Sequence, residues 1–298
     1  MNPKFPTRLF SRVLSDMKPQ LSIVIVNLNT KDLTLGCLRS IQKEGKGLSY
    51  EVLLTDNGST DGSVEALKSL QKESFWRNKL TLIFNKSNTG YGKANNQGIK
   101  KAEGKYVMLL NNDTIVHKDA LQNLIRFAKV TPDAGVIGSK LLNIDGSLQA
   151  SCFHFPTITN AIKEYWLGSK GLFDKYAPIT KKAVTVDSLV GAAFLITPLA
   201  LKRVGMLDER YFAYFEDIDY CRQTWRNGLK VYYLPDSVIT HYHGATFKKL
   251  ASDEAVRWRK LIPSSKIYHG WLRHYVLFFI LWLGQKWQKF LKTFFHTS

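Results

Sequence analysis

The chain has 298 residues, of which 45% are hydrophobic and 22% are charged, and this composition excludes a largely disordered protein. Its length is enough for one large α/β domain or two small ones. The formal net charge of +18 (42 basic minus 24 acidic residues) points to an anionic partner: a nucleotide, a nucleic acid or an acidic membrane surface. Three widely spaced cysteines, Cys37, Cys152 and Cys221, argue against a disulfide framework or a zinc site and favour a reducing compartment.

The first half of the chain alternates between strand and helix patterns. It begins with a basic extension, residues 1–19, that shows no signal-peptide pattern. The predicted strands are Leu21–Val26, Glu51–Leu54, Leu80–Phe84 and a run from Tyr106, and the predicted helices between them are Asp32–Ile41, Ser63–Leu70 and Gly92–Ala102. This alternation predicts an α/β fold with a mostly parallel central sheet and helices on both faces.

Polar residues follow three of these strands at the point where each strand ends. They are Asn27 and Asn29, the loop from Asp56 to Ser63, and Asn111-Asn112-Asp113. Ligands of open α/β sheets bind beyond the carboxyl ends of the strands, so these side chains are candidates to face a ligand. Ordinary strand caps and turns use the same residue types and remain the alternative.

Two common phosphate-binding motifs are missing from this pattern. A dinucleotide fold needs Gly-x-Gly-x-x-Gly after its first strand, and a P-loop needs Gly-Lys-Ser or Gly-Lys-Thr; the sequence has neither at these positions. Nucleotide phosphates, if they are bound, must therefore be held by a metal ion or by side chains.

Taken together, these segments resemble the family 2 inverting glycosyltransferases of the GT-A fold, and most closely their rhamnosyltransferase-like branch. The resemblance covers residues 20–250 and rests on Ser22 to Asn29, Asp56 to Ser63, Asn88 to Gly90, Ala94 to Ile99 and Leu110 to Thr114. It implies a GT-A domain at residues 20–247, with a nucleotide-sugar-binding half at 20–116 and an acceptor-binding half at 117–247.

The resemblance also implies a binding site for a nucleotide-sugar. Asp56 would accept a hydrogen bond from the ring N–H of uracil or thymine, and Asn27 and Asn29 would line the same pocket. The full set of implied nucleotide-sugar contacts is Asn27, Asn29, Asp56, Asn57, Gly58, Ser59, Asn88, Gly90, Asn95, Asn111, Asn112 and Asp113.

A divalent metal ion, Mn²⁺ or Mg²⁺, is the implied cofactor. Asn111-Asn112-Asp113 takes the place of the family's Asp-x-Asp motif, but its first position is Asn, so Asp113 is the one carboxylate left to bind the ion. The family's His-x-x-Gly element fits His241 to Gly244, which makes His241 the second metal candidate and His243 the runner-up. Because imidazole suits Mn²⁺ better than Mg²⁺, this assignment favours manganese.

The acidic pair Glu216-Asp217 lies where the family has its catalytic carboxylates. Read without the resemblance, the pair would complement the positive end of a helix dipole. With it, Asp217 becomes the catalytic base and Glu216 its neighbour, because inverting transfer needs one base to take the acceptor's proton. Tyr214, Phe215 and Asp219 are the expected acceptor contacts.

The last 51 residues, 248–298, form a basic and aromatic tail with ten Lys or Arg and two acidic residues. Cations mixed with Trp and Phe are typical of an amphipathic helix that lies on an anionic membrane. Its apolar run, Tyr275–Leu283, is too short to span a bilayer. A helix packed on the domain or in a dimer is the alternative. The basic residues could also form a nucleic-acid-binding patch, but the sequence contains no recognised nucleic-acid-binding module beside them.

The sequence thus predicts a cytoplasmic enzyme, attached peripherally to the inner face of the cell membrane. It would transfer a sugar from a dTDP- or UDP-sugar to a lipid-linked glycan in surface polysaccharide biosynthesis. Two alternatives remain at this point: a sugar-phosphate nucleotidyltransferase, and a non-catalytic membrane-associated glycan-binding protein.

Overall fold

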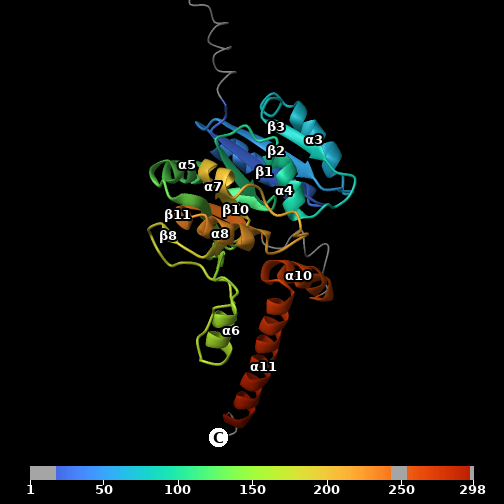
Figure 1. Ribbon diagram of the computed structural model, residues 1–298. Coiled ribbons are helices and arrows are strands. Elements are labelled where there is room, and N and C mark those ends of the chain that lie inside the picture. The colour runs from blue at the N-terminus through green and yellow to red at the C-terminus, as the bar shows by residue number, and fades with distance from the viewer. Residues whose placement is uncertain (1–17, 243–253, 296–298) are drawn as a thin grey trace, which may run out of the picture.

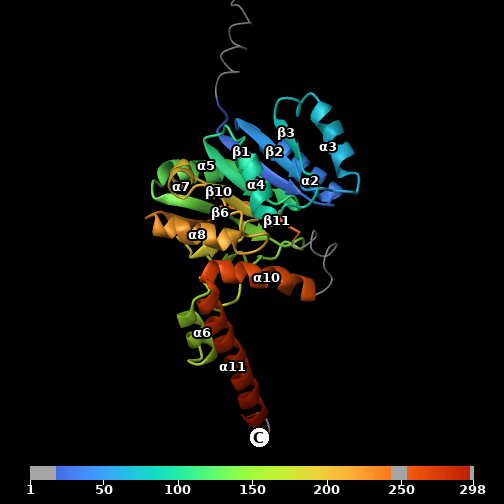
Figure 2. The same ribbon diagram turned by 45° about the vertical axis from the view of Figure 1, so that its right-hand side comes forward.

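A computed structural model of the chain describes residues 18–242 and 254–295. Within them, nine strands form one central sheet in the order β3-β2-β1-β4-β10-β6-β11-β5, with β8 paired to β11 (Figures 1 and 2). A second sheet pairs the short strands β7 and β9.

The half of the sheet that the first four strands form is parallel, as the sequence predicts. Its strands are β1 (Leu21–Asn27), β2 (Tyr50–Asp56), β3 (Leu80–Phe84) and β4 (Tyr106–Leu110), and the helices between them are α2 (Lys31–Glu44), α3 (Ser63–Lys72) and α4 (Tyr91–Ile99). The carboxyl ends of β1, β2 and β4 therefore meet at one edge.

The other half of the sheet is mixed, so the uninterrupted parallel order of the first four strands does not continue through it. It contains β5 (Thr114–Val116), β6 (Ala134–Leu142), β8 (Val184–Thr185), β10 (Ala193–Ile196) and β11 (Lys230–His241). Strand β10 is antiparallel to both β4 and β6, whereas β6 and β11 are parallel. The antiparallel insertion of β10 brings the start of that strand to the edge where β4 ends.

Helices cover both faces of the sheet, and the residues of β1 divide between them with a period of two. Ile23 and Ile25 pack in one core with α2, α3 and α5 (Ala120–Val130), and Val24 packs in the other with α4, α7 (Pro198–Arg203) and α8 (Glu216–Arg226). The acidic helix start expected at Glu216 is confirmed as the first residue of α8.

Three helices lie outside this layered body or at its border. α6 (Ile158–Tyr165) follows β7 (Cys152–Phe153) and precedes β9 (Ser188–Leu189) in the sequence, and α10 (Glu254–His269) leads into α11 (Trp271–Phe295). Both views show α11 projecting away from the sheet with α6 beside it (Figures 1 and 2). No helix in residues 18–242 and 254–295 is both long and apolar enough to cross a membrane.

Candidate active site

Asn27, at the end of β1, is a buried junction beneath the sheet edge. Its Nδ2 donates hydrogen bonds to Asp56 Oδ2 (2.7 Å) and Ser59 Oγ (3.1 Å), and the residue is fully buried. Its Oδ1 accepts from three further groups, the hydroxyls of Thr30 and Thr34 and the amide of Asn112. Asn27 therefore fixes the orientation of Asp56, and the expectation that it also lines a nucleotide pocket stays a prediction.

The Asp56 loop is held closed by its own backbone. Asp56 Oδ1 accepts hydrogen bonds from the N–H groups of Gly58 (3.2 Å) and Ser59 (2.9 Å). Its Oδ2 accepts from Asn27 and retains a lone pair for one more donor. Asn29 joins this loop from the other side, because its Oδ1 accepts from Thr60 N at 2.7 Å.

A third loop, residues 85–90, is tied to the Asp56 loop by amide side chains. Asn57 Nδ2 donates to Asn88 Oδ1 (2.9 Å), which also accepts from Gly90 N (2.9 Å). Asn95 lies one turn into α4 and is buried, with its Nδ2 on the carbonyl oxygen of Tyr91. The structure thus brings most of the predicted nucleotide-sugar residues together at one sheet edge, where Asn27 and Asn95 act as buried supports.

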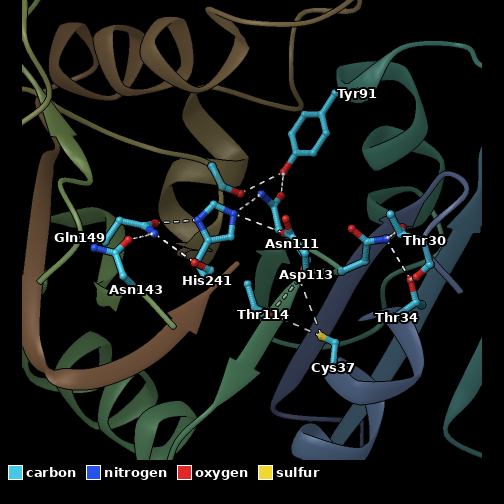
Figure 3. A network of polar contacts seen from close by, with 12 residues as sticks. Thr30, Thr34, Cys37, Tyr91, Asn111, Asp113, Thr114, Asn143, Gln149 and His241 are labelled. Atoms are coloured by element: carbon cyan, nitrogen blue, oxygen red, sulfur yellow. Dashed lines mark hydrogen bonds and ion pairs between the residues drawn. The ribbon is translucent and has the colours of Figure 1, made fainter. Parts of the chain in front are cut away.

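The Asn111-Asn112-Asp113 segment turns from β4 into β5 and places its side chains on two sides. Asn112 is buried, and its Nδ2 lies within hydrogen-bonding distance of Asn27 Oδ1 and of the hydroxyls of Thr30 and Thr34. It is therefore a structural residue rather than a ligand contact. Asn111 and Asp113 face the opposite side, toward His241 (Figure 3).

His241 ends β11 directly beside this segment, because β11 pairs with β5 in a register that sets His241 opposite Thr114. Its Nδ1 lies 2.7 Å from Gln149 Oε1. The Gln149 amide nitrogen donates to Asn143 Oδ1 (2.8 Å) and to the His241 carbonyl (3.0 Å), so the amide oxygen must face the ring. His241 Nδ1 consequently carries the proton, and the lone pair of Nε2 points into the site.

Two hydrogen-bond acceptors, His241 Nε2 and Asp113 Oδ1, face each other beside the Asn111–Asp113 turn. His241 Nε2 lies 3.3 Å from Asp113 Oδ1, and Asn111 Nδ2 approaches the same ring nitrogen at 3.2 Å. A carboxylate oxygen and an imidazole lone pair at this separation fit a shared cation, and this donor set suits Mn²⁺ better than Mg²⁺. In the part of the chain that the structure describes, no three His, Cys, Asp or Glu side chains group to hold a metal ion. His243, the runner-up, lies outside the described residues.

The acidic pair at the start of α8 differs in its hydrogen bonding. Asp217 Oδ2 accepts from Gly191 N (2.9 Å) and its Oδ1 from Ile218 N (2.8 Å). Glu216 is 8% exposed, and its buried Oε2 has no hydrogen-bond partner among the described residues. Asp217 is half-buried, which leaves it the more accessible carboxylate of the two.

The two carboxyl groups are driven toward different protonation states. Burial, with the charge of Asp217, raises the pKa of Glu216 to about 8. Burial also raises the pKa of Asp217, but the Gly191 and Ile218 N–H groups and the charge of Lys175 oppose the rise. Because hydrogen bonds from backbone N–H groups favour a carboxylate, Asp217 ionises before Glu216, which keeps its proton at neutral pH.

Tyr91 joins the two parts of the site. Its hydroxyl lies 3.0 Å from Asn111 Oδ1 (Figure 3). The same hydroxyl lies 2.9 Å from the Gly191 carbonyl oxygen. Gly191 N in turn donates to Asp217, and Asn111 contacts His241. Burial and the nearby charges of Glu216 and Asp217 raise the pKa of Tyr91, so its hydroxyl stays neutral. Asp113 and Asp217 therefore share one continuous polar network.

The expected acceptor residues lie on the segment before and within the first turn of α8. Tyr214 and Phe215 have φ angles of 69° and 72°, in the left-handed region that residues other than glycine rarely adopt. Tyr214 is half-buried, whereas the Phe215 ring packs on Tyr268 of α10 (centroids 5.2 Å apart). Asp219 is 7% exposed and forms an ion pair with Arg222, so it supports the helix rather than facing an open cleft.

Several residues of this network were not found from the sequence. Tyr91 directly follows the quoted Asn88-Thr-Gly90 element, and its place at a helix start beside a strand-end loop was a usable signal. A Cβ at Gly90 would lie 2.7 Å from the Phe212 carbonyl oxygen, which shows how closely the segment before α8 approaches the start of α4. Gln149 and Lys175 lie outside helices and strands, in segments where the sequence contains no recognisable motif.

The architecture matches that of solved glycosyltransferases and is a GT-A fold. The mannosyltransferase from Pyrobaculum calidifontis in complex with GDP-Man and Mn²⁺ has a TM-score of 0.56 to this chain at 16% identity, over 88% of this chain and 64% of that one. At this identity the likeness concerns the fold alone, and it confirms the predicted fold class.

Sequence comparison gives the family. Residues 22–176, just over half of the chain, match the model of glycosyl transferase family 2, and the chain belongs to this family. It is 27% identical over 208 residues to the N-acetylglucosaminyl-diphospho-decaprenol L-rhamnosyltransferase of Mycobacterium tuberculosis, covering 64% of this chain and 66% of that protein. It is 25% identical over 255 residues to the O-antigen biosynthesis protein RfbC of Myxococcus xanthus, covering 85% of this chain and 19% of that protein.

These comparisons confirm the resemblance to family 2 and to its rhamnosyltransferase-like branch. The chain spans slightly less than two thirds of the length of the mycobacterial relative, and a much smaller share of RfbC.

Proposed function

We propose that this chain is an inverting glycosyltransferase that moves a sugar from a dTDP- or UDP-sugar to a hydroxyl group of a lipid-linked glycan during surface polysaccharide biosynthesis. The observation that carries the proposal is the polar network from Asp113 through His241, Asn111 and Tyr91 to Gly191 and Asp217. It connects the proposed metal ligands, Asp113 and His241, with the proposed base, Asp217.

The donor is proposed to bind at the edge formed by β1, β2 and β4. Asp56 retains one free lone pair on Oδ2 for a pyrimidine N–H, and the loops that hold it are already closed by internal hydrogen bonds. Such pre-organisation lowers the entropy that binding must overcome. Asn29, Asn57, Gly58, Ser59, Asn88 and Gly90 complete this wall.

Asp113 and His241 are proposed to hold a divalent metal ion, which would neutralise the diphosphate of the donor. A single carboxylate and one imidazole supply only part of a coordination shell, so metal affinity should rise strongly when a nucleoside diphosphate is present. Support comes from the similar Pyrobaculum enzyme, which was solved with Mn²⁺.

Asp217 is proposed to act as the base. Its carboxylate takes the proton of the acceptor hydroxyl as the acceptor oxygen bonds to C1 of the sugar, and the bond from C1 to the diphosphate oxygen breaks on the opposite face. Glu216, which keeps its proton near neutral pH, does not compete for that role. Tyr214 is the proposed acceptor contact. Phe215, which packs on Tyr268, and Asp219, which pairs with Arg222, are proposed to hold the segment that carries it.

The acceptor and location are proposed from the relatives and from the tail. The mycobacterial relative is named for an acceptor sugar on diphospho-decaprenol. Residues 248–298 carry a surplus of eight positive charges, which suits peripheral attachment to the cytoplasmic face of an anionic membrane.

A screen of nucleotide-sugars for release of nucleoside diphosphate tests the proposal, with and without Mn²⁺ or Mg²⁺. We expect metal-dependent release from a dTDP- or UDP-sugar that increases when a glycan acceptor is added. Formation of a nucleotide-sugar from a nucleoside triphosphate would instead support a nucleotidyltransferase. Glycan binding without any release would support the non-catalytic alternative.

A further inference from the structure

The tail of the chain is divided between two structural roles. The end of α10 packs on the segment before α8 and on α8 itself: Ser264 Oγ donates to the Ala213 carbonyl (2.8 Å), and the Arg222 guanidinium lies 3.6 Å from the centroid of the Tyr268 ring. α11 instead leaves the body of the molecule (Figure 2). Most of the described side chains of α11 are therefore not covered by the central sheet and its helices.

α11 has a second helix as its partner, and that helix comes from the acceptor half of the domain. A Cβ at Gly284 would lie 2.6 Å from Tyr165 Cβ, so a glycine is needed where α11 crosses α6. Trp287 of α11 stacks on Trp166, just after α6, with ring planes 13° apart. We refer to residues 158–171 and 271–288 together as the arm.

The arm exposes large apolar side chains on both of its segments. Those on α11 form two adjacent stripes at helical spacing, Trp271, Tyr275, Phe278 and Trp282 in one and Leu272, Val276, Phe279 and Leu283 in the other. On the α6 side Leu167 is 71% exposed, and Ile162 and Trp166 are also exposed. Monomeric soluble proteins rarely leave so broad an apolar surface in water, so the arm must have a partner.

The chemistry of the arm indicates what covers it. It contains four cations, Lys163, Lys170, Arg273 and Lys286, and one carboxylate, Glu164, which already accepts from Phe173 N at 2.9 Å. A second copy of the arm would bring like charges together. Exposed Trp rings beside cations instead match the boundary between the headgroups and the acyl chains of an anionic bilayer.

We propose that α6 and α11 form one arm that lies in the interface of an anionic phospholipid bilayer. This inference rests on the membrane association proposed above and adds to it the part of the chain that makes the contact, including α6, which lies outside the tail. Because α10 joins the arm to the segment that precedes Glu216, the site would be held at a fixed height above the lipid surface.

The test is vesicle sedimentation of the full-length protein, without donor or acceptor, on vesicles of 30% phosphatidylglycerol in phosphatidylcholine and on pure phosphatidylcholine. Leu167→Asp in the α6 segment and Phe279→Asp in α11 each place a charge in the proposed contact. Ile179→Asp is the matched control, because Ile179 is 98% exposed but lies outside both helices. Circular dichroism melting checks that all three variants remain folded.

We expect binding to the anionic vesicles that weakens in high salt, a loss of affinity of about tenfold for Leu167→Asp and for Phe279→Asp, and no change for Ile179→Asp. Wild-type binding that Leu167→Asp leaves intact would overturn the α6 contact while leaving membrane association in place. No binding by the wild type, or a dimer in sedimentation equilibrium that Leu167→Asp dissociates, would overturn the arm as a lipid surface. None of these outcomes depends on sugar transfer, which is measured separately.

Discussion

The two sides of the site that we propose to bind the nucleotide and the acceptor are positioned by different physical means, and we call them the nucleotide side and the acceptor side. On the nucleotide side, Asn27, Asp56 and Asn57 join three loops through side-chain hydrogen bonds that leave almost no polar atom unused. On the acceptor side, Tyr214 and Phe215 adopt left-handed backbone conformations, and the adjacent Glu216 has a buried oxygen with no partner among the described residues. The first region is pre-organised by satisfied bonds, whereas the second is a strained segment kept in place by packing against α10.

The largest effect on activity is expected from substituting the proposed base, Asp217, on the acceptor side. Asp217→Asn removes the proposed base and keeps an acceptor oxygen for one of the two N–H groups, those of Gly191 and Ile218, that donate to Asp217. We expect the rate of sugar transfer to fall roughly 10²- to 10⁴-fold, the range for loss of a general base. The measurement is kcat for transfer to a glycan acceptor. Asp236→Asn, at an exposed position on β11, is the control, and an equal loss in both variants would contradict the assignment.

A smaller effect, on metal affinity, is expected from substituting Gln149, which accepts the hydrogen bond of His241 Nδ1. Gln149→Leu removes the acceptor that keeps the proton on His241 Nδ1. Gln122→Leu, at a half-buried glutamine of α5 that bonds the Glu44 carbonyl instead, is the control. Mutation of such supporting partners typically costs 10- to 100-fold in metal affinity, so we expect a loss of about that size for Gln149→Leu and none for Gln122→Leu. Titration of Mn²⁺ by electron paramagnetic resonance, with nucleoside diphosphate present, gives the affinity. ¹⁵N shifts of the metal-free imidazole give the tautomer, and an unchanged tautomer in Gln149→Leu would refute the proposed support.

Tyr91→Phe tests the connection between the two sides. The substitution deletes the hydroxyl that contacts Asn111 and the Gly191 carbonyl but keeps the ring. Loss of one such hydrogen bond is worth about 1 kcal/mol, so we expect kcat/KM to fall roughly fivefold to tenfold. Tyr165→Phe, at a tyrosine outside this network, provides the comparison. If Tyr91→Phe has no more effect than Tyr165→Phe, the hydroxyl does not join the two sides.

The last effect is on the stability of the protein rather than on its activity, and it depends on pH. The folded-state pKa of Glu216, about 8, lies above its ordinary value of 4.5. The folded protein therefore keeps a proton that the unfolded chain has lost, and wild-type stability should fall as pH rises from about 4.5 to 8, by at most roughly 1.4 kcal/mol per pH unit from this group. Glu216→Gln removes this slope.

Urea unfolding at pH 5 and pH 8.5 measures this pH dependence of the free energy of unfolding. We expect Glu216→Gln to gain stability relative to the wild type at pH 8.5 compared with pH 5, whereas Glu65→Gln, at an exposed position on α3, should show no such gain. Parallel behaviour of Glu216→Gln and wild type at both pH values would show that Glu216 is not held neutral.

The sequence predicted the half of the sheet that the first four strands form well, because local patterns specify it. The strand Leu80–Phe84 is confirmed at both ends, and Leu21–Val26 falls one residue short of β1. Buried parallel strands read as continuous apolar runs, and each one ends in a polar loop, so the periodicity and the turn residues agree. The same logic located Asp113 at a strand end and Asp217 at a helix start.

The parts that were missed depend on contacts between distant segments. The antiparallel entry of β10 is set by its pairing with β4 and β6, which no local pattern encodes. Asn27 and Asn112 have residue types suited to a ligand site, and only their burial shows that they support it. α6 lies in residues 145–183, which carry no periodic signal strong enough to assign, and its role depends on α11, about 120 residues further along the chain.

The central claim is that one site separates two tasks, with Asp113 serving the diphosphate and Asp217 serving the acceptor. Calorimetric titration of UDP and dTDP, with and without Mn²⁺, into wild type, Asp113→Asn and Asp217→Asn tests it most directly. The account predicts that Asp113→Asn loses the gain in nucleotide affinity that Mn²⁺ gives, while Asp217→Asn binds like the wild type. Retention of the Mn²⁺-dependent gain by Asp113→Asn, or its loss in Asp217→Asn, would contradict the account.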